Sequence, residues 1–286
     1  MIIVTGASGN LGTATVQRLL ERLPAERIGV SVRDPGKVSE LQARGIRVRR
    51  GDYDDAAGLA HAFEGASQVL IVSTATTGET AVRHHRTAID AAKQAGAGRI
   101  LYTSHMGSNP ASPFSPMPDH AATETALQDS GVPFTALRNG FYAASGAMLL
   151  GHALKSGELA VPDDGPVSWT AHADLAEAAA IALTEGGGLD GLTAALTGPE
   201  AIDMAAMAQI ASEVTGRTIR RVVVPDEEYR AGLVAHGLPE SAADMLLGIF
   251  LASRKGEFAE VDPTLARLLG RRPAPLRDVL ATALPQ

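Results

Sequence analysis

Met1-Ile-Ile-Val-Thr-Gly-Ala-Ser-Gly-Asn-Leu-Gly12 is the stretch that decides the fold of this chain. Residues 2–4 form a β-branched run with no polar break, which predicts a strand buried on both faces, as parallel strands are. A glycine-rich turn follows at once, and residues 13–22 carry a helical pattern. Strand, glycine turn and helix in this order are typical of a dinucleotide-binding loop. The buried strand favours that interpretation over an ordinary glycine turn.

The three glycines of this stretch have separate expected roles. Gly6 permits the tight turn off the strand, Gly9 lets the backbone approach a pyrophosphate, and Gly12 lets the helix pack close to the strand. The start of the helix then points unpaired N–H groups and the positive end of its dipole at the phosphates. The sequence therefore predicts a dinucleotide held by Gly6, Ala7, Ser8, Gly9, Asn10, Leu11 and Gly12.

The composition limits the class of protein. The chain has 286 residues, of which 45% are hydrophobic, enough for one large domain or two closely joined ones. Its 25 basic and 32 acidic side chains give a net charge of −7 without any run of Lys or Arg, so no nucleic-acid partner is expected. Cysteine is absent, which excludes disulfides, thiolate nucleophiles and Cys-based zinc sites.

Targeting and metal signals are also missing from the sequence. The N-terminus lacks a basic segment followed by an apolar one, and no apolar run has membrane-spanning length. A soluble, cytoplasmic protein without a membrane partner is therefore expected, as a monomer or homodimer. The adjacent His84 and His85 face different directions on a predicted helix and have no further ligand at metal-binding spacing, so no metal site is predicted.

The tip of the second strand indicates which dinucleotide is bound. Residues 27–32 predict this strand, and in dinucleotide folds its tip meets the adenosine ribose, where an acid binds the 2′-hydroxyl and an arginine accommodates a 2′-phosphate. Arg33 stands at the tip and Lys37 one helical turn later, which favours NADPH. Asp34 is a counter-signal for NAD, yet Asp followed by Pro35 is also a helix start. We take Asp34 as an N-cap and predict NADPH.

Alternating strands and helices predict the fold class. Further strands are expected at residues 46–50, 68–72 and 99–103, with helices between them. This order predicts an α/β fold with a doubly wound, Rossmann-like parallel sheet. Ligands of such sheets bind outside the carboxyl ends of the strands. Residues at those ends are therefore predicted to contact the cofactor: Asp52, Tyr53, Ser73, Thr74, Ala75, Thr103 and Ser104.

The pattern becomes less regular after residue 105. Residues 109–118 contain four prolines and predict a stiff, partly apolar loop that is neither helix nor central strand, with Asp119 capping a helix to residue 128. Candidate substrate contacts in and before this loop are His105, Phe114 and Met117. Further strands are expected at 133–137, 158–161, 192–196 and 219–224, and helices at 144–155, 171–183, 203–214 and, in short pieces, over 226–284.

Two domains are expected from this organisation. A dinucleotide-binding domain is predicted over residues 1–140 plus 166–197. A smaller, mainly helical substrate domain is predicted over residues 141–165 plus 198–286.

A short-chain dehydrogenase would be expected to carry a YxxxK pair. The residues four positions after the chain's tyrosines are Ala57, Met106, Gly146 and Leu233, so this pair is absent. Where it would fall, His120 and Glu124 share one helix face at i, i+4 spacing. They are either a polar pair beside the nicotinamide, with His120 as a catalytic candidate, or an exposed pair at a helix start.

Several motifs together resemble one family. They are residues 5–12, 32–37, 51–55, 101–104, Asp119-His-Ala-Ala-Thr-Glu124, Leu137-Arg-Asn-Gly-Phe-Tyr142 and Gly270-Arg-Arg-Pro273. Nearly end to end, the chain resembles the NmrA-like atypical short-chain dehydrogenases, in particular bacterial type two quinone oxidoreductases and triphenylmethane reductases. The resemblance implies NADP(H) held by the glycine loop, Arg33, the 73–75 turn and the segment Asn139, Phe141 and Tyr142. It also implies a substrate between that segment and the C-terminal domain. Phe141 stands where the quinone reductases usually have Trp.

The missing Tyr–Lys pair has a chemical meaning. Reduction of a ketone creates a strongly basic alkoxide that needs a positioned acid, whereas a quinone gives a delocalised phenolate that water can protonate. Hydride addition to a dye carbocation needs no proton. The sequence therefore predicts an NADPH-dependent oxidoreductase for planar, electron-poor small molecules, most simply a quinone or cationic dye, acting by proximity. The alternative is an NADP(H)-sensing NmrA-like regulator without turnover.

Residues after the sixth strand are the expected floor of the substrate site. An aromatic pair, Phe141 and Tyr142, offers flat faces to a quinone. Asn139 can bridge cofactor and substrate because its amide both donates and accepts, so Asn139 and Tyr142 join His120 as catalytic candidates. The alternative is that Phe141 and Tyr142 are packing at the hinge between the domains.

Overall fold

The computed structural model describes residues 1–185 and 188–285. Its strands are β1 Ile2–Thr5, β2 Ile28–Val32, β3 Arg47–Arg50, β4 Gln68–Ile71, β5 Arg99–His105, β6 Phe134–Asn139, β7 Phe141–Tyr142, β8 Glu158–Val161, β9 Trp169–Thr170, β10 Gly191–Leu192 and β11 Arg220–Val223. Its α-helices are α1 Asn10–Leu20, α2 Ser39–Ala43, α3 Ala56–Phe63, α4 Glu79–Gln94, α5 Pro116–Asp129, α6 Ala143–Leu149, α7 Ala153–Ser156, α8 His172–Thr184, α9 Met204–Thr215, α10 Asp226–Ala235, α11 Glu240–Arg254, α12 Thr264–Leu269 and α13 Leu276–Ala283. Two 3-10 turns, η1 Ala25–Arg27 and η2 Pro35–Val38, flank β2.

The N-terminal part is built around a seven-stranded sheet. Its strand order is β10-β6-β5-β4-β1-β2-β3, and all neighbouring strands are parallel. β1 lies between β2 and β4, so that Val4 is opposite Val30 on one side and Leu70 on the other. The predicted doubly wound, Rossmann-like sheet is therefore confirmed. Because the strands are parallel, the loops after β1, β2, β4, β5 and β6 meet at one edge.

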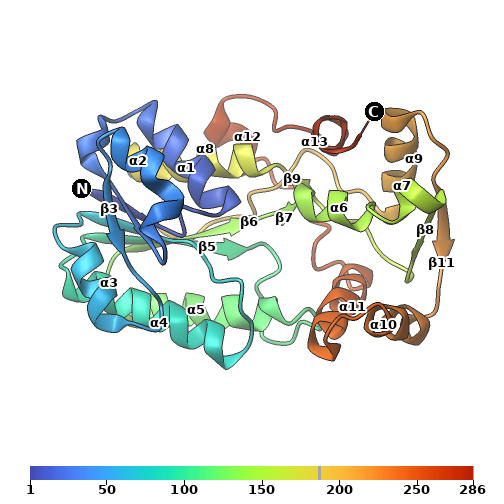
Figure 1. Cartoon of the computed structure of the whole chain (residues 1–286), viewed down its shortest axis with the longest axis horizontal. Helices are drawn as coiled ribbons and strands as arrows, with labels where there is room; N and C mark the ends of the chain where they lie inside the picture. Colours follow the sequence, from blue (N-terminus) through green and yellow to red (C-terminus); the bar gives the residue numbers. More distant parts are fainter. Residues whose placement is uncertain (186–187, 286) are drawn as a thin grey trace.

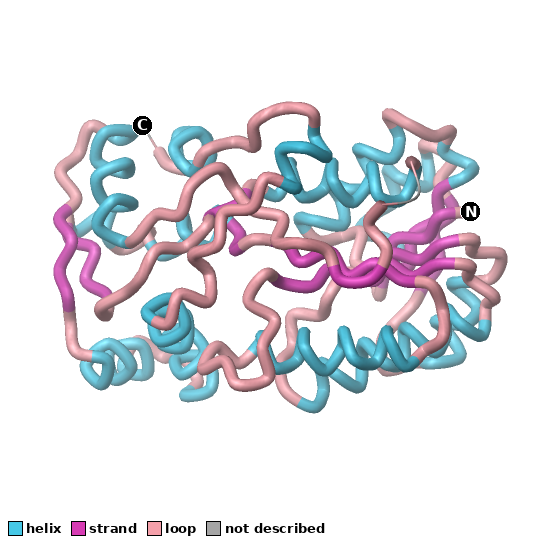
Figure 2. Tube along the Cα trace, turned by 180° about the vertical axis from the view of Figure 1, so that it is seen from behind, coloured by secondary structure: helices cyan, strands magenta, loops and turns pink. Residues whose placement is uncertain are grey.

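Helices cover both faces of this sheet (Figures 1 and 2). Side chains alternate along β1: Ile2 and Val4 pack with α1 and α8 on one face, and Ile3 packs with α3 and α4 on the other. Ile2, Ile3 and Val4 are all buried, because helices cover both faces of the sheet. A strand buried on both faces has an unbroken apolar sequence, as β1 does.

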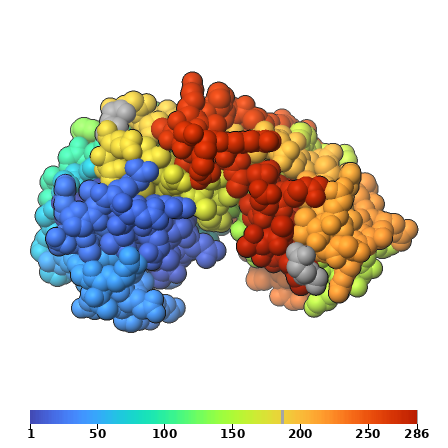
Figure 3. All heavy atoms as spheres, turned by 90° about the horizontal axis from the view of Figure 1, so that it is seen from above, coloured from blue at the N-terminus to red at the C-terminus, as the bar shows by residue number. Residues whose placement is uncertain are grey.

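The C-terminal part has an apolar cluster of its own. It gathers side chains from α6, β8, α9, α11 and α13 around the buried Trp169 and Phe250. β8 pairs in parallel with β11 in a separate two-stranded sheet. Seen from above, the surface is deeply hollowed between the blue N-terminal residues and the red and orange C-terminal ones (Figure 3). The exact domain bounds stay a prediction. Across the described residues, no helix combines the length and apolarity that a bilayer crossing requires.

The proline-rich segment departs from the sequence prediction. Pro116 and Pro118 lie in the first turn of α5, so residues 116–118 are helical and the prediction that 109–118 contains no helix is wrong. The first-turn N–H groups of a helix have no intrahelical partner, and proline therefore loses nothing there. The N-cap is Ser115 rather than Asp119, whose carboxylate instead accepts a hydrogen bond from the Gly78 amide at 2.7 Å.

Other boundaries also differ. The predicted helix 144–155 is divided into α6 and α7, and the last region contains one long helix, α11. The predicted strand 192–196 is reduced to β10, although Leu196 still donates its amide to the Arg138 carbonyl and forms an isolated bridge with Asn139. This segment therefore runs beside β6 without continuous pairing.

Candidate active site

The glycine loop has the geometry that its spacing predicts. Gly6 has a φ of 60°, which side-chain-bearing residues rarely adopt. A Cβ on Gly12 would lie 2.3 Å from the Gly6 carbonyl oxygen, so the start of α1 approaches the loop as only glycine allows. The N-cap residue is Gly9, which has no side chain to cap the helix, and the first turn of α1 contains no acidic residue. The N-terminal amides of α1 therefore remain available to an anion.

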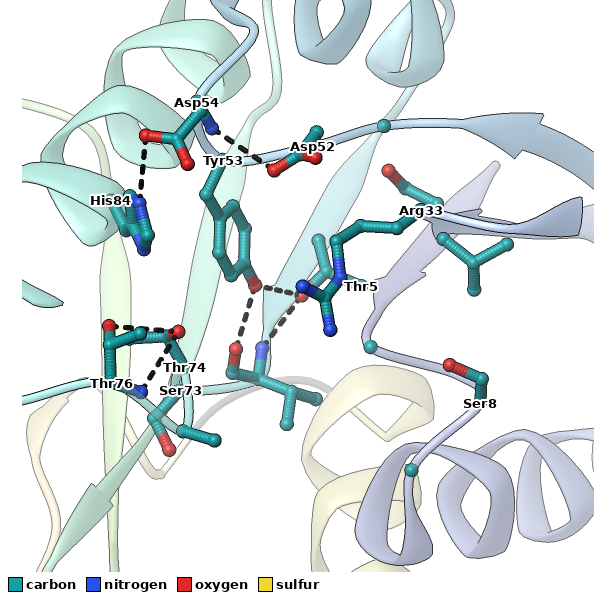
Figure 4. A pocket seen from close by; sticks show the side chains of 17 residues that line it. Thr5, Ser8, Arg33, Asp52, Tyr53, Asp54, Ser73, Thr74, Thr76 and His84 are labelled. Atoms are coloured by element: carbon teal, nitrogen blue, oxygen red, sulfur yellow. Dashed lines mark hydrogen bonds and ion pairs between the residues drawn. The ribbon is translucent and has the colours of Figure 1, made fainter. Parts of the chain in front are cut away.

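A pocket of about 370 Å³ opens at the carboxyl edge of β1, β2 and β4 (Figure 4). Of the predicted cofactor contacts, it is lined by Gly6, Ser8, Gly9, Arg33, Asp52, Tyr53, Ser73, Thr74 and Ala75. The predicted residues outside its lining are Ala7, Asn10, Leu11, Gly12, Lys37, Thr103, Ser104, Asn139, Phe141 and Tyr142. The pocket thus unites the glycine loop with the ends of β2 and β4.

Arg33 is the exposed cation at this pocket. Figure 4 shows its side chain extending into the pocket, and it forms no hydrogen bond or ion pair with any described residue. Asp34 caps η2 by accepting a hydrogen bond from the Gly36 amide at 3.0 Å, as predicted. Lys37 is exposed and does not line the pocket. The arrangement leaves the Arg33 guanidinium free for an anionic ligand.

Tyr53 links the carboxyl ends of β3, β1 and β4 through hydrogen bonds. Its hydroxyl donates to the Val72 carbonyl at 2.7 Å and lies 2.7 Å from Thr5 Oγ1, which accepts the Val72 amide at 2.8 Å (Figure 4). Burial raises the pKa of Tyr53 far above its ordinary value, so the phenol stays neutral. Tyr53 therefore shapes the pocket wall with its ring while its hydroxyl is committed to the protein.

The turn after β4 is held from behind by side chains. Thr103 Oγ1 accepts the Ser73 amide at 2.8 Å, and His85 Nε2 accepts the Thr74 amide at 3.0 Å. Because Nε2 accepts, the His85 proton is assigned to Nδ1, which lies 2.8 Å from Thr123 Oγ1. Burial lowers the pKa of His85 to about 3. His85 is therefore a neutral, packed residue.

His120 is paired with a tyrosine and not with Glu124. Its Nδ1 lies 2.8 Å from the Tyr102 hydroxyl, and its ring stacks on His105 with centroids 6.1 Å apart. Burial lowers the pKa of His120 to about 4 and holds that of His105 well below its ordinary value. Both imidazoles are therefore neutral at pH 7, and Tyr102 donates to His120 Nδ1, which places the His120 proton on Nε2.

Glu124 belongs to a second buried group. Arg138 donates to both of its carboxylate oxygens, at 2.9 and 2.7 Å, and Ser104 Oγ donates to one of them at 2.6 Å. Glu124 is 5% exposed, so the interpretation of His120 and Glu124 as an exposed helix-start pair is wrong. Register explains the contact, because Ser104 lies opposite Arg138 in the sheet.

Asn139 presents an unsatisfied acceptor. The residue is 1% exposed, and its Oδ1 has no hydrogen-bond partner among the described residues. Burial raises the pKa of Tyr142, and a hydrogen bond from Asn139 partly offsets this. The Tyr142 ring lies 4.3 Å from that of His172, between centroids. A buried carbonyl oxygen without a protein partner is suited to accept from a ligand amide or hydroxyl.

Phe141 lies in an aromatic cluster. Its ring centroid is 5.1 to 5.7 Å from those of His105, Phe114, Trp169 and Phe258. Phe141 is 5% exposed and Met117 is fully buried. The packed wall between the two parts of the molecule thus contains four of the predicted substrate residues, His105, Phe114, Met117 and Phe141. The fifth, Tyr142, lies outside this wall.

Sequence reasoning missed several pocket residues. Ser31 Oγ is buried without a partner among the described residues, and a Cβ on Gly51 would lie 2.1 Å from it. Asp54 and His84, 3.0 Å apart, also line the pocket, as does Thr76. An available signal was the position of Ser31 near the end of the predicted strand 27–32, two residues before Arg33. Neither His172 nor Tyr102 carried such a signal, because their partners are distant in the sequence. The described residues include no group of three or more side chains suited to a metal ion.

The donor set fits a dinucleotide: free helix amides, a glycine cradle that side chains would fill, and an unpaired arginine at one pocket. Comparison with known proteins agrees with this. A sequence model described as NAD(P)H-binding matches residues 6–186.

The chain is similar over nearly its whole length to characterised reductases. It is 35% identical to quinone oxidoreductase 2 of Escherichia coli, covering 94% of each chain. The crystal structure of that enzyme complexed with NADPH matches 99% of each chain, with a TM-score of 0.93 at 33% identity. An NmrA-like family domain-containing oxidoreductase of Aspergillus flavus is 30% identical, covering 99% of this chain and 94% of the relative.

A second solved structure shows the same arrangement. The Citrobacter sp. triphenylmethane reductase complexed with NADP(H) has a TM-score of 0.91 at 34% identity, covering 99% of this chain and all of the other. The chain therefore belongs to the NAD(P)H-binding family and, within it, to the NmrA-like oxidoreductases.

Proposed function

We propose that this protein is an NADPH-dependent oxidoreductase that transfers hydride to a planar, electron-poor acceptor, a quinone or a cationic dye-like compound. The proposal rests on the neutral, Tyr102-bound His120 at the helix position where a Tyr–Lys pair would supply an acid. A neutral imidazole is a weak proton donor at pH 7. Acceptors whose reduced form needs no strong acid suit such a site. Two of the similar proteins are named for quinone and triphenylmethane substrates.

The residues that would hold the cofactor lie along one edge of the sheet. The α1 amides and the glycine loop would bind the pyrophosphate, and Arg33 the 2′-phosphate. The 73–75 turn, fixed by Thr103 and His85, would pass beside the cofactor. Reduced nicotinamide supplies the hydride when it is bound.

Asn139 and Tyr142 would orient the reacting rings. The free Asn139 Oδ1 can accept a hydrogen bond from a carboxamide or a substrate hydroxyl, and Tyr142 is steadied by His172. Residues of this kind raise the rate by holding reactants in a productive geometry. His120 would contribute polarity and shape, with water protonating the product.

The test is NADPH oxidation with a panel of quinones, a triarylmethane dye and a simple ketone. Turnover is expected with quinones and the dye and not with the ketone. His120→Ala should lower quinone kcat by less than about tenfold, because a true general acid contributes about 10²–10⁴-fold. His61→Ala is a control, because His61 of α3 is exposed and pairs with Glu64, the residue after that helix.

Two results would overturn the proposal. NADPH binding without turnover of any acceptor would leave a regulatory binding protein. A loss above a hundredfold in His120→Ala, with normal NADPH affinity, would make His120 a general acid.

A further inference from the structure

A second pocket, of about 490 Å³, lies in the C-terminal part and shares no lining residue with the first. Residues of α6, β8, α10 and α11 line it, and these elements lie toward the right-hand end of Figure 1. Its walls include Met148 and Leu149 of α6, Leu159 of β8, Tyr229 and Leu233 of α10, and Leu246 of α11. Its volume is within the range of sites for small organic molecules.

The chemistry of the walls favours an uncharged apolar group. The described lining contains no Lys or Arg, and its basic side chains are two histidines, His152 and His236. Its two carboxylates, Glu158 and Glu228, would repel an anionic group, and Glu158 is held by Arg220 at 2.7 Å. Tyr229 packs edge-on against Phe250, with centroids 5.3 Å apart, so one wall is a fixed aromatic surface. Walls of this kind bind aliphatic groups most favourably, because both surfaces are then removed from water.

One short helix, α6, separates the proposed acceptor site from the pocket. Helix α6 starts at Ala143, directly after Tyr142, and Met148 lies about 7.5 Å from Ala143 along the helix axis. Met148 is 81% exposed although it borders an apolar pocket. A flexible, polarizable methionine adapts to ligands of varied shape. A substituent on a ring at the Tyr142 end of α6 would therefore run along this short helix to reach the pocket.

We infer that this pocket binds an aliphatic or isoprenoid chain attached to the ring of the acceptor. The inference rests on the proposed function, because it places the ring beside Asn139 and Tyr142. It names the class of substrate more narrowly: a quinone with an uncharged apolar side chain is preferred over the same ring with a methyl group or an acidic chain.

Gly232 allows the pocket to be filled selectively. This residue lies in α10 and lines the pocket, and a Cβ built on it meets no heavy atom within 4 Å. Gly232→Phe therefore adds a ring at the pocket wall without a clash at its base. Gly232→Ala is the matched control, because it makes the same change of backbone freedom with little loss of volume.

The experiment measures kcat/KM for one quinone ring carrying methyl, butyl, heptyl or decyl chains, in the wild type and both variants. Wild type and Gly232→Ala should gain up to about fourfold per added methylene until the pocket is full. In Gly232→Phe the ratio of decyl to methyl kcat/KM should fall by at least about tenfold. A chain ending in a carboxylate should lose the gain in wild type.

Decanol gives a readout independent of turnover. It should raise the Tm of the wild type and of Gly232→Ala and leave that of Gly232→Phe unchanged. If neither the quinones nor the triarylmethane dye are reduced, the proposed function fails, whatever decanol does. If the methyl quinone is reduced but neither chain length nor decanol has any effect in the wild type, this inference alone is overturned. Retention of the full chain-length gain in Gly232→Phe would overturn it as well.

Discussion

Arg33 is the residue on which we expect cofactor choice to depend. Its guanidinium lines the pocket and has no partner among the described residues, and a bidentate contact with phosphate is strong and charge-assisted. Arg33→Ala should raise the Kd for NADPH by at least about tenfold, near 1.4 kcal/mol, with little effect on NADH. Fluorescence titration with both cofactors measures this.

Lys37 provides the matched control for Arg33. It carries the same charge four residues later, yet it is exposed and outside the pocket lining. Lys37→Ala should therefore change the NADPH affinity by less than about twofold, as surface charges contribute little. Equal losses for NADPH and NADH in Arg33→Ala would show that the arginine does not recognise the 2′-phosphate.

Predictability at this scale follows from the distance between partners. Asp34 could be assigned as a cap because its partner, Gly36, is two residues away. The surroundings of His120 could not be deduced, because Tyr102 is 18 residues earlier on another element. Sequence reasoning placed His120 and Glu124 on one helix face, but the neighbouring strands decide which side chains they meet.

At the scale of elements, the sheet was predictable and the helix starts were less so. Most strands of the sheet are short and largely apolar, with the arginine-rich β3 as the exception, and a glycine or acidic turn marks the end of most. The start of α5 was missed because prolines in a first helical turn look like loop signals. The strand predicted at 192–196 is longer than the observed β10, because residues 193–196 follow β6 through isolated contacts and do not form a continuous ladder with it.

The short strand β7 is fixed by aromatic packing, and this gives a stability prediction. Phe141 is 5% exposed and its ring meets four others at centroid distances up to 5.7 Å. Phe141→Ala should lower the free energy of unfolding by about 3–5 kcal/mol, because truncation leaves a cavity between the two parts. Urea unfolding measures the loss.

An exposed apolar residue serves as the control for Phe141. Val223 on β11 is 62% exposed, and Val223→Ala should change stability by no more than about 0.5 kcal/mol. If Phe141→Ala instead keeps its stability and loses kcat/KM for quinones, Phe141 contacts the substrate and is not hinge packing.

For the whole molecule, buried histidines make stability depend on pH. Burial lowers the pKa of His85 to about 3 from the ordinary 6.5. Between these values the unfolded chain binds a proton that the folded protein does not, so the free energy of unfolding rises with pH. The contribution of His85 to stability is therefore full above about pH 6.5 and declines as the pH falls toward 3. One such proton corresponds to about 1.4 kcal/mol per pH unit.

His85→Gln isolates this contribution. The amide can still accept from Thr74 and donate to Thr123, while it does not titrate. Urea unfolding at pH 7, 6, 5 and 4 should show a shallower decline for His85→Gln than for wild type, by up to one proton. Identical slopes would mean that His85 is protonated in the folded protein.

The central place of β1 has a consequence for synthesis on the ribosome. Both neighbours of β1, namely β2 and β4, are complete by residue 71, so the middle of the sheet can assemble early in translation. Helix α8, which covers one face of that sheet together with α1, is not complete until residue 184. A nascent chain thus carries a half-covered apolar sheet for more than a hundred residues, the interval in which chaperones would have most to bind.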